Sequence, residues 1–91
     1  MFDLVATTYF TKKLKKLSKG NKNLLGKVSK TLECLSLDPG NPKLRSHKVG
    51  QNFSSSVTGD IRIIWQYGRK QEIQILELLD IGGHTGKNSV Y

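Results

Sequence analysis

Three side chains in this 91-residue sequence are suited to proton transfer and anion binding: His84, Tyr91 and Arg62. His84 directly follows Ile81-Gly82-Gly83, and Tyr91 is the last residue, a short loop further on. Histidine is the side chain whose unperturbed pKa lies near neutrality, so it can give or take a proton under cell conditions. The pattern predicts a site that transfers protons to or from a negatively charged ligand.

Arg62 lies within a stretch of β-branched and aromatic residues, 61–67, which is typical of a strand. A guanidinium in the middle of a strand is costly unless it meets a carboxylate or a phosphate. One explanation is therefore a structural ion pair with Asp60, Glu77 or Asp80. The other is a fixed fork that grips a phosphate and stabilises the extra charge of a transition state.

The neighbouring strands predict what surrounds Arg62. By alternation, Ser54 and Ser56 form a polar stripe beside it, which fits a hydrated groove and fits an ordinary edge strand equally. On the other side, Leu76 and Leu78 are expected to share the face of Arg62, so the groove floor is predicted to be partly apolar.

A basic cluster, Lys43-Leu44-Arg45-Ser46-His47-Lys48, leads into the sheet. Loops placed between a turn and a strand commonly carry function, so Arg45, His47 and Lys48 are candidates for binding a polyanion. An ordinary charged connection explains the cluster equally well, and His47 is then a surface histidine without a role.

The net charge of +8, from 15 Lys and Arg against 7 Asp and Glu, implies strong attraction to polyanions. These are either nucleic acid or an acidic protein. Most of the cations are lysines, several of them on the first predicted helix, and lysine steers phosphates rather than reading bases. With His84 in mind, we expect RNA as the ligand, although a lysine-rich helix is also typical of a solvated surface.

The elements that must position these residues begin with a strand over Phe2–Ala6. A first helix is predicted to be capped by Thr7 or Thr8, and a second to be capped by Asn21 and ended by Asp38-Pro39-Gly40-Asn41-Pro42.

Three strands are predicted to follow, over 53–57, 61–67 and 73–81, with a hairpin loop at 68–71. The expected fold is a single α+β domain, residues 1–91, in which an N-terminal strand and a two-helix hairpin precede a three-strand antiparallel meander.

Several classes of protein are not expected from this sequence. Cys34 is the single cysteine, so an internal disulfide is excluded and a reducing compartment is indicated. The N-terminal residues show no secretory signal, and no segment is long and apolar enough to span a membrane, so cytoplasm is the expectation. His47 and His84 lack a third ligand at metal spacing, and we expect neither a metal nor another cofactor.

Four segments together resemble the RelE/ParE toxin superfamily. They are Lys43–Gly50, Phe53–Trp65, Leu78–His84 and Val90–Tyr91. The likeness covers essentially the whole chain and is closest to the RelE- and YafQ-like mRNA interferases. Gly59-Asp60-Ile61-Arg62-Ile63-Ile64-Trp65 and Ile81-Gly82-Gly83-His84 are the more specific parts, whereas the helical half is generic.

The resemblance implies a type II toxin that cuts mRNA in the ribosomal A site, without a metal, and is held inactive by an antitoxin. Cleavage would proceed by attack of a ribose 2′-OH on the adjacent phosphate. The implied partners are mRNA, the ribosome and the antitoxin, with a monomeric toxin alone and a hetero-oligomer in the inhibited complex.

The resemblance also implies roles for individual residues. Arg62 matches the strand arginine that stabilises the transition state, and His84 matches the histidine that protonates the departing 5′-oxygen. Asp60 falls near the active groove, and Tyr91 matches a terminal tyrosine implicated in base stacking or proton transfer. A loosely aligned basic or histidine position falls near His47 and Lys48.

Two departures from the family pattern matter. Ser54 and Ser56 stand where relatives carry lysines or a histidine, and serine cannot act as a general base. The connection between His84 and Tyr91 is longer than in the family, although its Lys87 can supply part of the missing positive charge. Two alternatives therefore stay open: a ParE-like toxin that poisons gyrase without nuclease activity, and a degenerate, non-toxic RNA-binding member.

Overall fold

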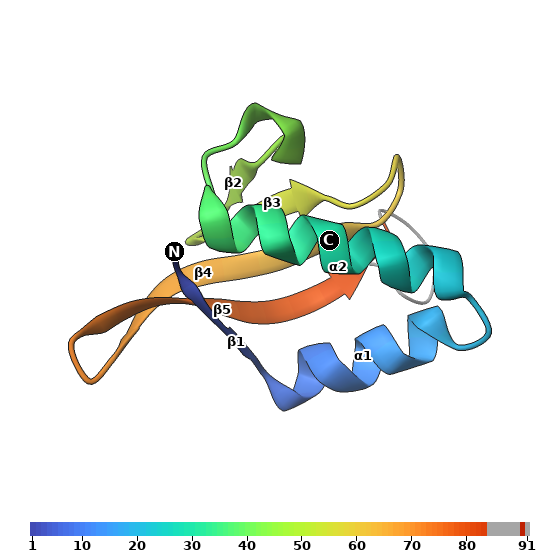
Figure 1. Ribbon diagram of the computed structural model, residues 1–91, viewed down its shortest axis with the longest axis horizontal. Helices are drawn as coiled ribbons and strands as arrows, with labels where there is room; N and C mark the ends of the chain where they lie inside the picture. Colours follow the sequence, from blue (N-terminus) through green and yellow to red (C-terminus); the bar gives the residue numbers. More distant parts are fainter. Residues whose placement is uncertain (84–89, 91) are drawn as a thin grey trace.

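A computed structural model of the chain, which describes residues 1–83 and 90, shows a five-stranded sheet with two helices packed on one face (Figure 1). The elements follow one another along the chain as β1 (Asp3–Ala6), α1 (Thr8–Ser18), α2 (Lys22–Leu37), the 3₁₀ turn η1 (Pro42–Leu44), β2 (His47–Val49), β3 (Asn52–Ser56), β4 (Arg62–Lys70) and β5 (Ile73–Gly82).

The sheet is mixed, with the strand order β1-β5-β4-β3-β2. The α+β class and the strand–helix–helix beginning are confirmed. The three-strand meander was wrong in two respects, because β2 extends it to four antiparallel strands and β1 pairs in parallel with β5. The helices return the chain to β2, which runs opposite to β1, and the three antiparallel pairings from β2 to β5 leave β5 parallel to β1.

Both predicted helix starts are confirmed. The Thr7 hydroxyl accepts a hydrogen bond from the Phe10 amide at 3.1 Å, and the Asn21 side chain accepts from the Leu24 amide at 3.0 Å. Each cap satisfies an amide that the first helical turn leaves free. Gly20, with φ of +71°, lets the chain leave α1. Neither helix is long and apolar enough to cross a membrane.

The core lies between the helices and the sheet. It is formed by apolar side chains from α1, α2, η1, β4 and β5: Phe10, Val28, Leu35, Leu44, Ile63, Trp65, Leu76, Leu78 and Ile81. Burying them is the main source of stability in so small a domain. The opposite face of the sheet carries the residues that alternate with these.

A bulge in β5 changes which residues lie on that opposite face. Ile64 is paired with Asp80 but Trp65 is paired with Leu78, so Leu79 is an extra residue. One extra residue reverses the alternation, because side chains point to opposite faces in turn. The prediction that Leu76 and Leu78 share the face of Arg62 was therefore wrong, and both pack in the core.

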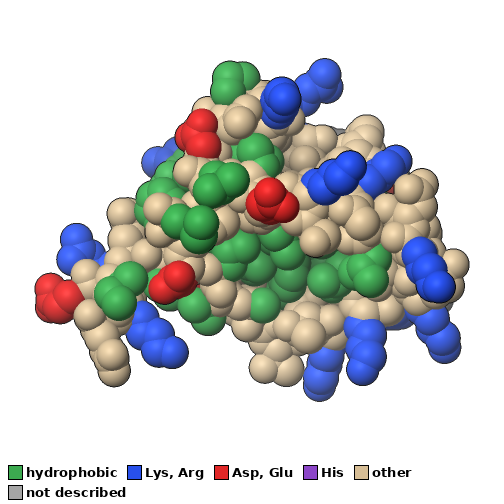
Figure 2. Space-filling view, viewed as in Figure 1, with side chains coloured by type: hydrophobic (Ala, Val, Ile, Leu, Met, Phe, Trp, Pro, Cys, Tyr) green, Lys and Arg blue, Asp and Glu red, His purple; other side chains and the backbone are tan. Residues whose placement is uncertain are grey.

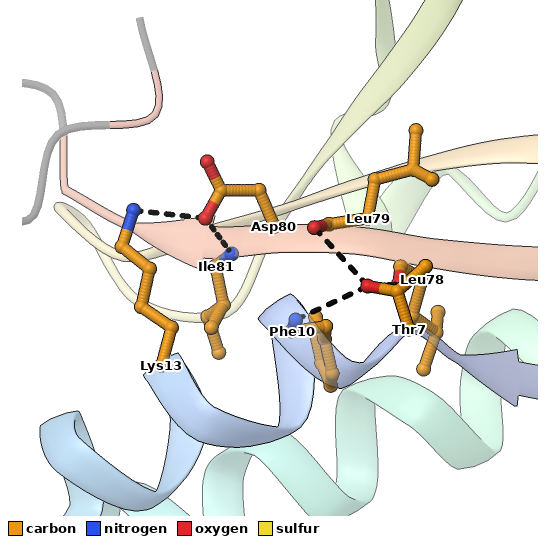
Figure 3. A network of polar contacts seen from close by, with 7 residues as sticks. All are labelled: Thr7, Phe10, Lys13, Leu78, Leu79, Asp80 and Ile81. Carbon is orange, nitrogen blue, oxygen red and sulfur yellow. Dashed lines mark hydrogen bonds and ion pairs between the residues drawn. The ribbon is translucent and has the colours of Figure 1, made fainter.

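Polar contacts from α1 hold the bulge in place (Figure 3). The Thr7 hydroxyl donates to the Leu78 carbonyl at 2.9 Å, and the Asp80 carboxylate accepts from Lys13 Nζ and from the Ile81 amide, each at 2.8 Å. The start of α1 is thus fastened to the part of β5 where the register changes.

The hairpin between β4 and β5 turns at Gln71 and Glu72, not over the predicted residues 68–71. Both have positive φ, 52° and 72°, as a two-residue type I′ turn requires. Glycine and asparagine usually occupy such positions, so the sequence signal for this turn was weak and Gly68 misplaced it.

Candidate functional site

Arg62 stands at the first position of β4, on the sheet face away from the helices. The register places it beside Ser56 of β3 and beside Gly82 of β5. Gly82 has no side chain to cover the guanidinium from that side. Arg62 is half-buried.

Neutral groups hold the guanidinium in one orientation. Nε donates to the Ser54 hydroxyl at 2.6 Å, and Nη2 donates to the Arg45 and Ser54 carbonyls at 2.7 and 2.9 Å. Among the described residues Nη1 has no hydrogen-bond partner, so its two N–H groups are available to an anion.

The predicted structural ion pair is not what residues 1–83 show. Asp80 binds Lys13 at 2.8 Å, while Glu77 accepts a long bond from Gln66 at 3.4 Å. No carboxylate in the described part of the chain pairs with Arg62, which therefore keeps its charge. A half-buried, oriented and uncompensated guanidinium is a binding group for a phosphate or carboxylate.

Arg45 contributes through its backbone. Its φ and ψ are 47° and 44°, in the left-handed region that L residues with side chains seldom adopt. This conformation ends η1 and turns the Arg45 carbonyl toward Arg62. Local strain of this kind gathers at functional sites. The sequence could not predict this role, because every residue has a backbone carbonyl and its type does not show how that carbonyl is used.

His47 is the ionisable side chain nearest to the guanidinium in the described residues. Its Nδ1 lies 3.4 Å from Arg62 Nη2. The guanidinium can only donate, so the contact is a hydrogen bond in the tautomer that leaves Nδ1 without a proton. His47 pairs with Ser54 across the β2–β3 ladder, which places it on the same face as Arg62.

The serines of β3 have separate roles. Ser54 is fully buried beneath the guanidinium, so it orients Arg62 and does not line an open groove. The Ser56 hydroxyl donates to the Thr58 carbonyl at 2.8 Å and shapes the β3–β4 turn. On the core side, Ser55 accepts from Trp65 Nε1 at 2.7 Å and shares a bond with Ser46 at 2.6 Å.

Asp60 and the end of β5 lie against each other. A Cβ placed on Gly83 would come within 2.7 Å of Asp60 Oδ2, so the carboxylate would have to shift to admit any other residue there. The Val90 amide donates to the Gly83 carbonyl at 3.0 Å, which returns the chain to the end of β5. His84, Lys87 and Tyr91 lie outside the described residues.

Lys48 is not brought to the Arg62 face. It pairs with Phe53, whose ring stacks on Trp65, so its position in β2 belongs to the helix side of the sheet. Of the predicted site residues that the structure describes, Arg62, His47, Ser54 and the Arg45 backbone meet. Asp60 lies beside Gly83.

Comparison with known proteins identifies the fold. No protein-family model matches the sequence, and no curated protein matches it. Among solved structures, the YoeB/ParE toxin from Agrobacterium tumefaciens is 14% identical, with a TM-score of 0.77 over 92% of this chain and 100% of that one. YafQ from E. coli BL21(DE3) is 17% identical, with a TM-score of 0.70 over 91% of this chain and 93% of YafQ.

In the E. coli DinJ–YafQ complex, the matched chain is 19% identical, with a TM-score of 0.72 over 92% of this chain and 94% of that one. The chain thus has the fold of the YoeB and YafQ toxins, and the predicted likeness to the RelE/ParE superfamily is confirmed at the level of fold. At such identities a shared fold does not by itself carry a shared activity.

Proposed function

We propose that this chain is the toxin of a type II toxin–antitoxin system and acts as a metal-independent endoribonuclease on mRNA, in the ribosomal A site. The observation that carries the proposal is the environment of Arg62. Its guanidinium is oriented by neutral acceptors, lacks a carboxylate partner in the described residues, and offers Nη1 to an anion. An RNA phosphate supplies that anion, and the net charge of +8 attracts RNA to the surface.

In the proposed reaction a ribose 2′-OH attacks the adjacent phosphorus, and the bond from phosphorus to the 5′-oxygen breaks. The products are a 2′,3′-cyclic phosphate and a free 5′-hydroxyl. Arg62 stabilises the additional negative charge that the phosphate oxygens carry in the transition state. Because Ser54 and Arg45 fix the guanidinium beforehand, little reorganisation is needed when that charge develops.

Proton transfer is assigned to the two histidines. His84, two residues after the Arg62 partner Gly82, donates a proton to the departing 5′-oxygen. His47, whose Nδ1 lies 3.4 Å from Arg62 Nη2, accepts the proton of the 2′-OH, a role that Ser54 and Ser56 cannot fill. Tyr91 and Asp60 assist at the end of β5, where Val90 returns to Gly83.

The proposed inhibitor is an antitoxin protein, by analogy with the E. coli DinJ–YafQ toxin–antitoxin complex. Figure 2 shows a band of hydrophobic side chains between the two helices, with lysines and arginines mainly on its right and lower sides and a few acidic side chains on its upper and left sides. Leu14, Leu17, Leu24 and Leu32 of the helices are only partly buried. An amphipathic, acidic segment of the antitoxin matches both the apolar band and its basic surroundings.

The test is induction of the chain in bacteria without an antitoxin, followed by primer extension on cellular mRNA. Growth arrest with breaks in translated messages is expected. Arg62→Ala should lower cleavage about 10²- to 10³-fold, the effect of losing one oxyanion-stabilising donor, and His84→Ala about 10²- to 10⁴-fold. Arg69→Ala, which removes an exposed arginine from the same strand, is the matched control and should cleave normally.

The remaining outcomes separate the alternatives. Arrest accompanied by DNA damage and intact messages would identify a gyrase poison. Unimpaired growth and translation would identify a degenerate RNA-binding protein. Full cleavage by Arg62→Ala would remove the guanidinium from the mechanism.

A further inference from the structure

A hollow lies on the helix side of the sheet, at the edge formed by β2 and beyond the C-terminal end of α2. Its volume is about 480 Å³, within the range of about 300–1,000 Å³ that small-molecule sites occupy. The loop Pro39–Pro42, the segment Arg45–Lys48 and the rings of Phe53, Trp65 and Tyr67 line it. Arg45 and His47 belong also to the Arg62 site, whereas the three aromatic rings take no part in the proposed reaction.

The three rings form a fixed aromatic platform. Phe53 stacks on Trp65 with centroids 4.8 Å apart and an interplanar angle of 19°. Tyr67 meets both rings edge-on, at 5.6 and 5.1 Å. Trp65 is anchored by its bond to Ser55, whereas 44% of Tyr67 is exposed. An exposed tyrosine on an anchored aromatic base is a surface on which a planar ring can stack.

The charge around the platform is positive. Arg45, His47 and Lys48 line the hollow, and none of the acidic residues within 1–83 does. β2 is an edge strand of the sheet, and its successive side chains point to opposite faces. His47 pairs with Ser54 on the Arg62 face, and Lys48 pairs with Phe53 on the aromatic face. A polyanionic chain that crosses this edge therefore meets cations on both sides.

We propose that the aromatic hollow binds an unpaired base of the RNA strand, a nucleotide that flanks the one at Arg62, with Lys48 against its phosphate. The inference rests on the proposed function for the identity of the strand. Stacking is tolerant of sequence because every base has a π-face, and it combines with backbone contacts from lysine in proteins that hold single strands. The hollow would thus set where the RNA lies without reading its sequence.

The test is fluorescence anisotropy of the full chain with a labelled eight-nucleotide single-stranded RNA, 2′-O-methylated throughout so that it cannot be cleaved. Tyr67→Ala should weaken binding about 5- to 150-fold, the range reported by alanine substitution for one stacked base. Tyr67→Phe keeps the ring and should bind like the wild type. Lys48→Ala should weaken binding and flatten its salt dependence.

The matched control is Tyr9→Ala, which removes an exposed tyrosine of α1 that does not line the hollow. Equal affinities for all variants would overturn the inference, and so would a wild type that does not bind the RNA. An effect of Tyr67→Ala on antitoxin binding alone would also overturn it, in favour of a protein-docking surface.

Cleavage is measured separately on the same proteins. If the wild type binds RNA through Tyr67 but does not cut mRNA, the nuclease proposal fails while the RNA-binding hollow stands. If Arg62 is needed for cleavage but Tyr67→Ala binds normally, the hollow fails and the nuclease stands.

Discussion

At Arg62, the choice of partners decides what the residue can do. A carboxylate would neutralise the guanidinium and occupy the donors that a phosphate needs. A hydroxyl and two carbonyls orient the same group while leaving its charge intact. The Ser54 hydroxyl is the side-chain member of this set, and it is fully buried. Its contribution should therefore appear in catalysis as well as in stability.

Ser54→Ala is expected to lower kcat for RNA cleavage about 10- to 100-fold, because a lost hydrogen bond to a charged group corresponds to about 1.5–3 kcal/mol. Arg62 Nε would then lack its acceptor, and the guanidinium would no longer be held at one angle. Single-turnover cleavage with saturating enzyme measures the effect. Ser56→Ala is the matched control, since its hydroxyl bonds the Thr58 carbonyl and not Arg62.

The result is informative in either direction. An unchanged kcat in a folded Ser54→Ala protein would mean that the Arg45 and Ser54 carbonyls suffice to orient the guanidinium. An equal loss in both serine variants would point to the β3–β4 turn instead.

At the scale of elements, what the sequence could predict depended on how local the signal was. Thr7 and Asn21 cap their helices as predicted, because a cap depends on residues within one turn. β2 is three residues long and mostly exposed, and an alternation of apolar and polar residues cannot be recognised over so short a segment. The bulge at Leu79 depends on contacts with α1, which are distant in sequence.

For the site too, the sequence predicted the features that depend on neighbouring residues and missed those that depend on distant ones. Alternation along β3 and β4 correctly placed Ser54 and Ser56 on the face of Arg62. Alternation could not predict that Ser54 is buried, because its burial depends on how the Arg62 side chain packs against it. The Arg45 carbonyl was equally out of reach, since it depends on a left-handed backbone conformation.

Thr7→Val should destabilise the protein by about 1–3 kcal/mol, because one hydroxyl both caps α1 and bonds the Leu78 carbonyl at the bulge. Valine keeps the shape and the β-branch, so only the hydrogen bonds are lost. Urea unfolding measures the change in free energy. Thr8→Val, at an exposed position one residue on, should stay within about 0.5 kcal/mol of the wild type.

If the two threonine variants unfold alike, the Thr7 hydroxyl does not hold the bulge. A loss confined to Thr7→Val would show that the start of α1 and the register of β5 are stabilised together.

For the whole molecule, the net charge of +8 is spread unevenly. Lys12, Lys15, Lys16 and Lys19 surround one hollow on α1, of about 650 Å³. These lysines are either a phosphate-attracting face or a solvated surface that keeps the protein soluble. The two explanations differ in how RNA binding should respond to salt, because each neutralised phosphate releases counterions.

Lys12→Gln with Lys16→Gln tests the first explanation. If these lysines contact RNA, the slope of log K against log salt should become shallower by about 0.7 for each lost phosphate contact on a single strand. Cleavage at saturating protein should stay unchanged, because the pair lies outside the Arg62 site. A matched pair at Lys30 and Lys70, away from this hollow, controls for net charge alone. Equal slopes in both double variants would mean that α1 attracts RNA only through the total charge of the protein.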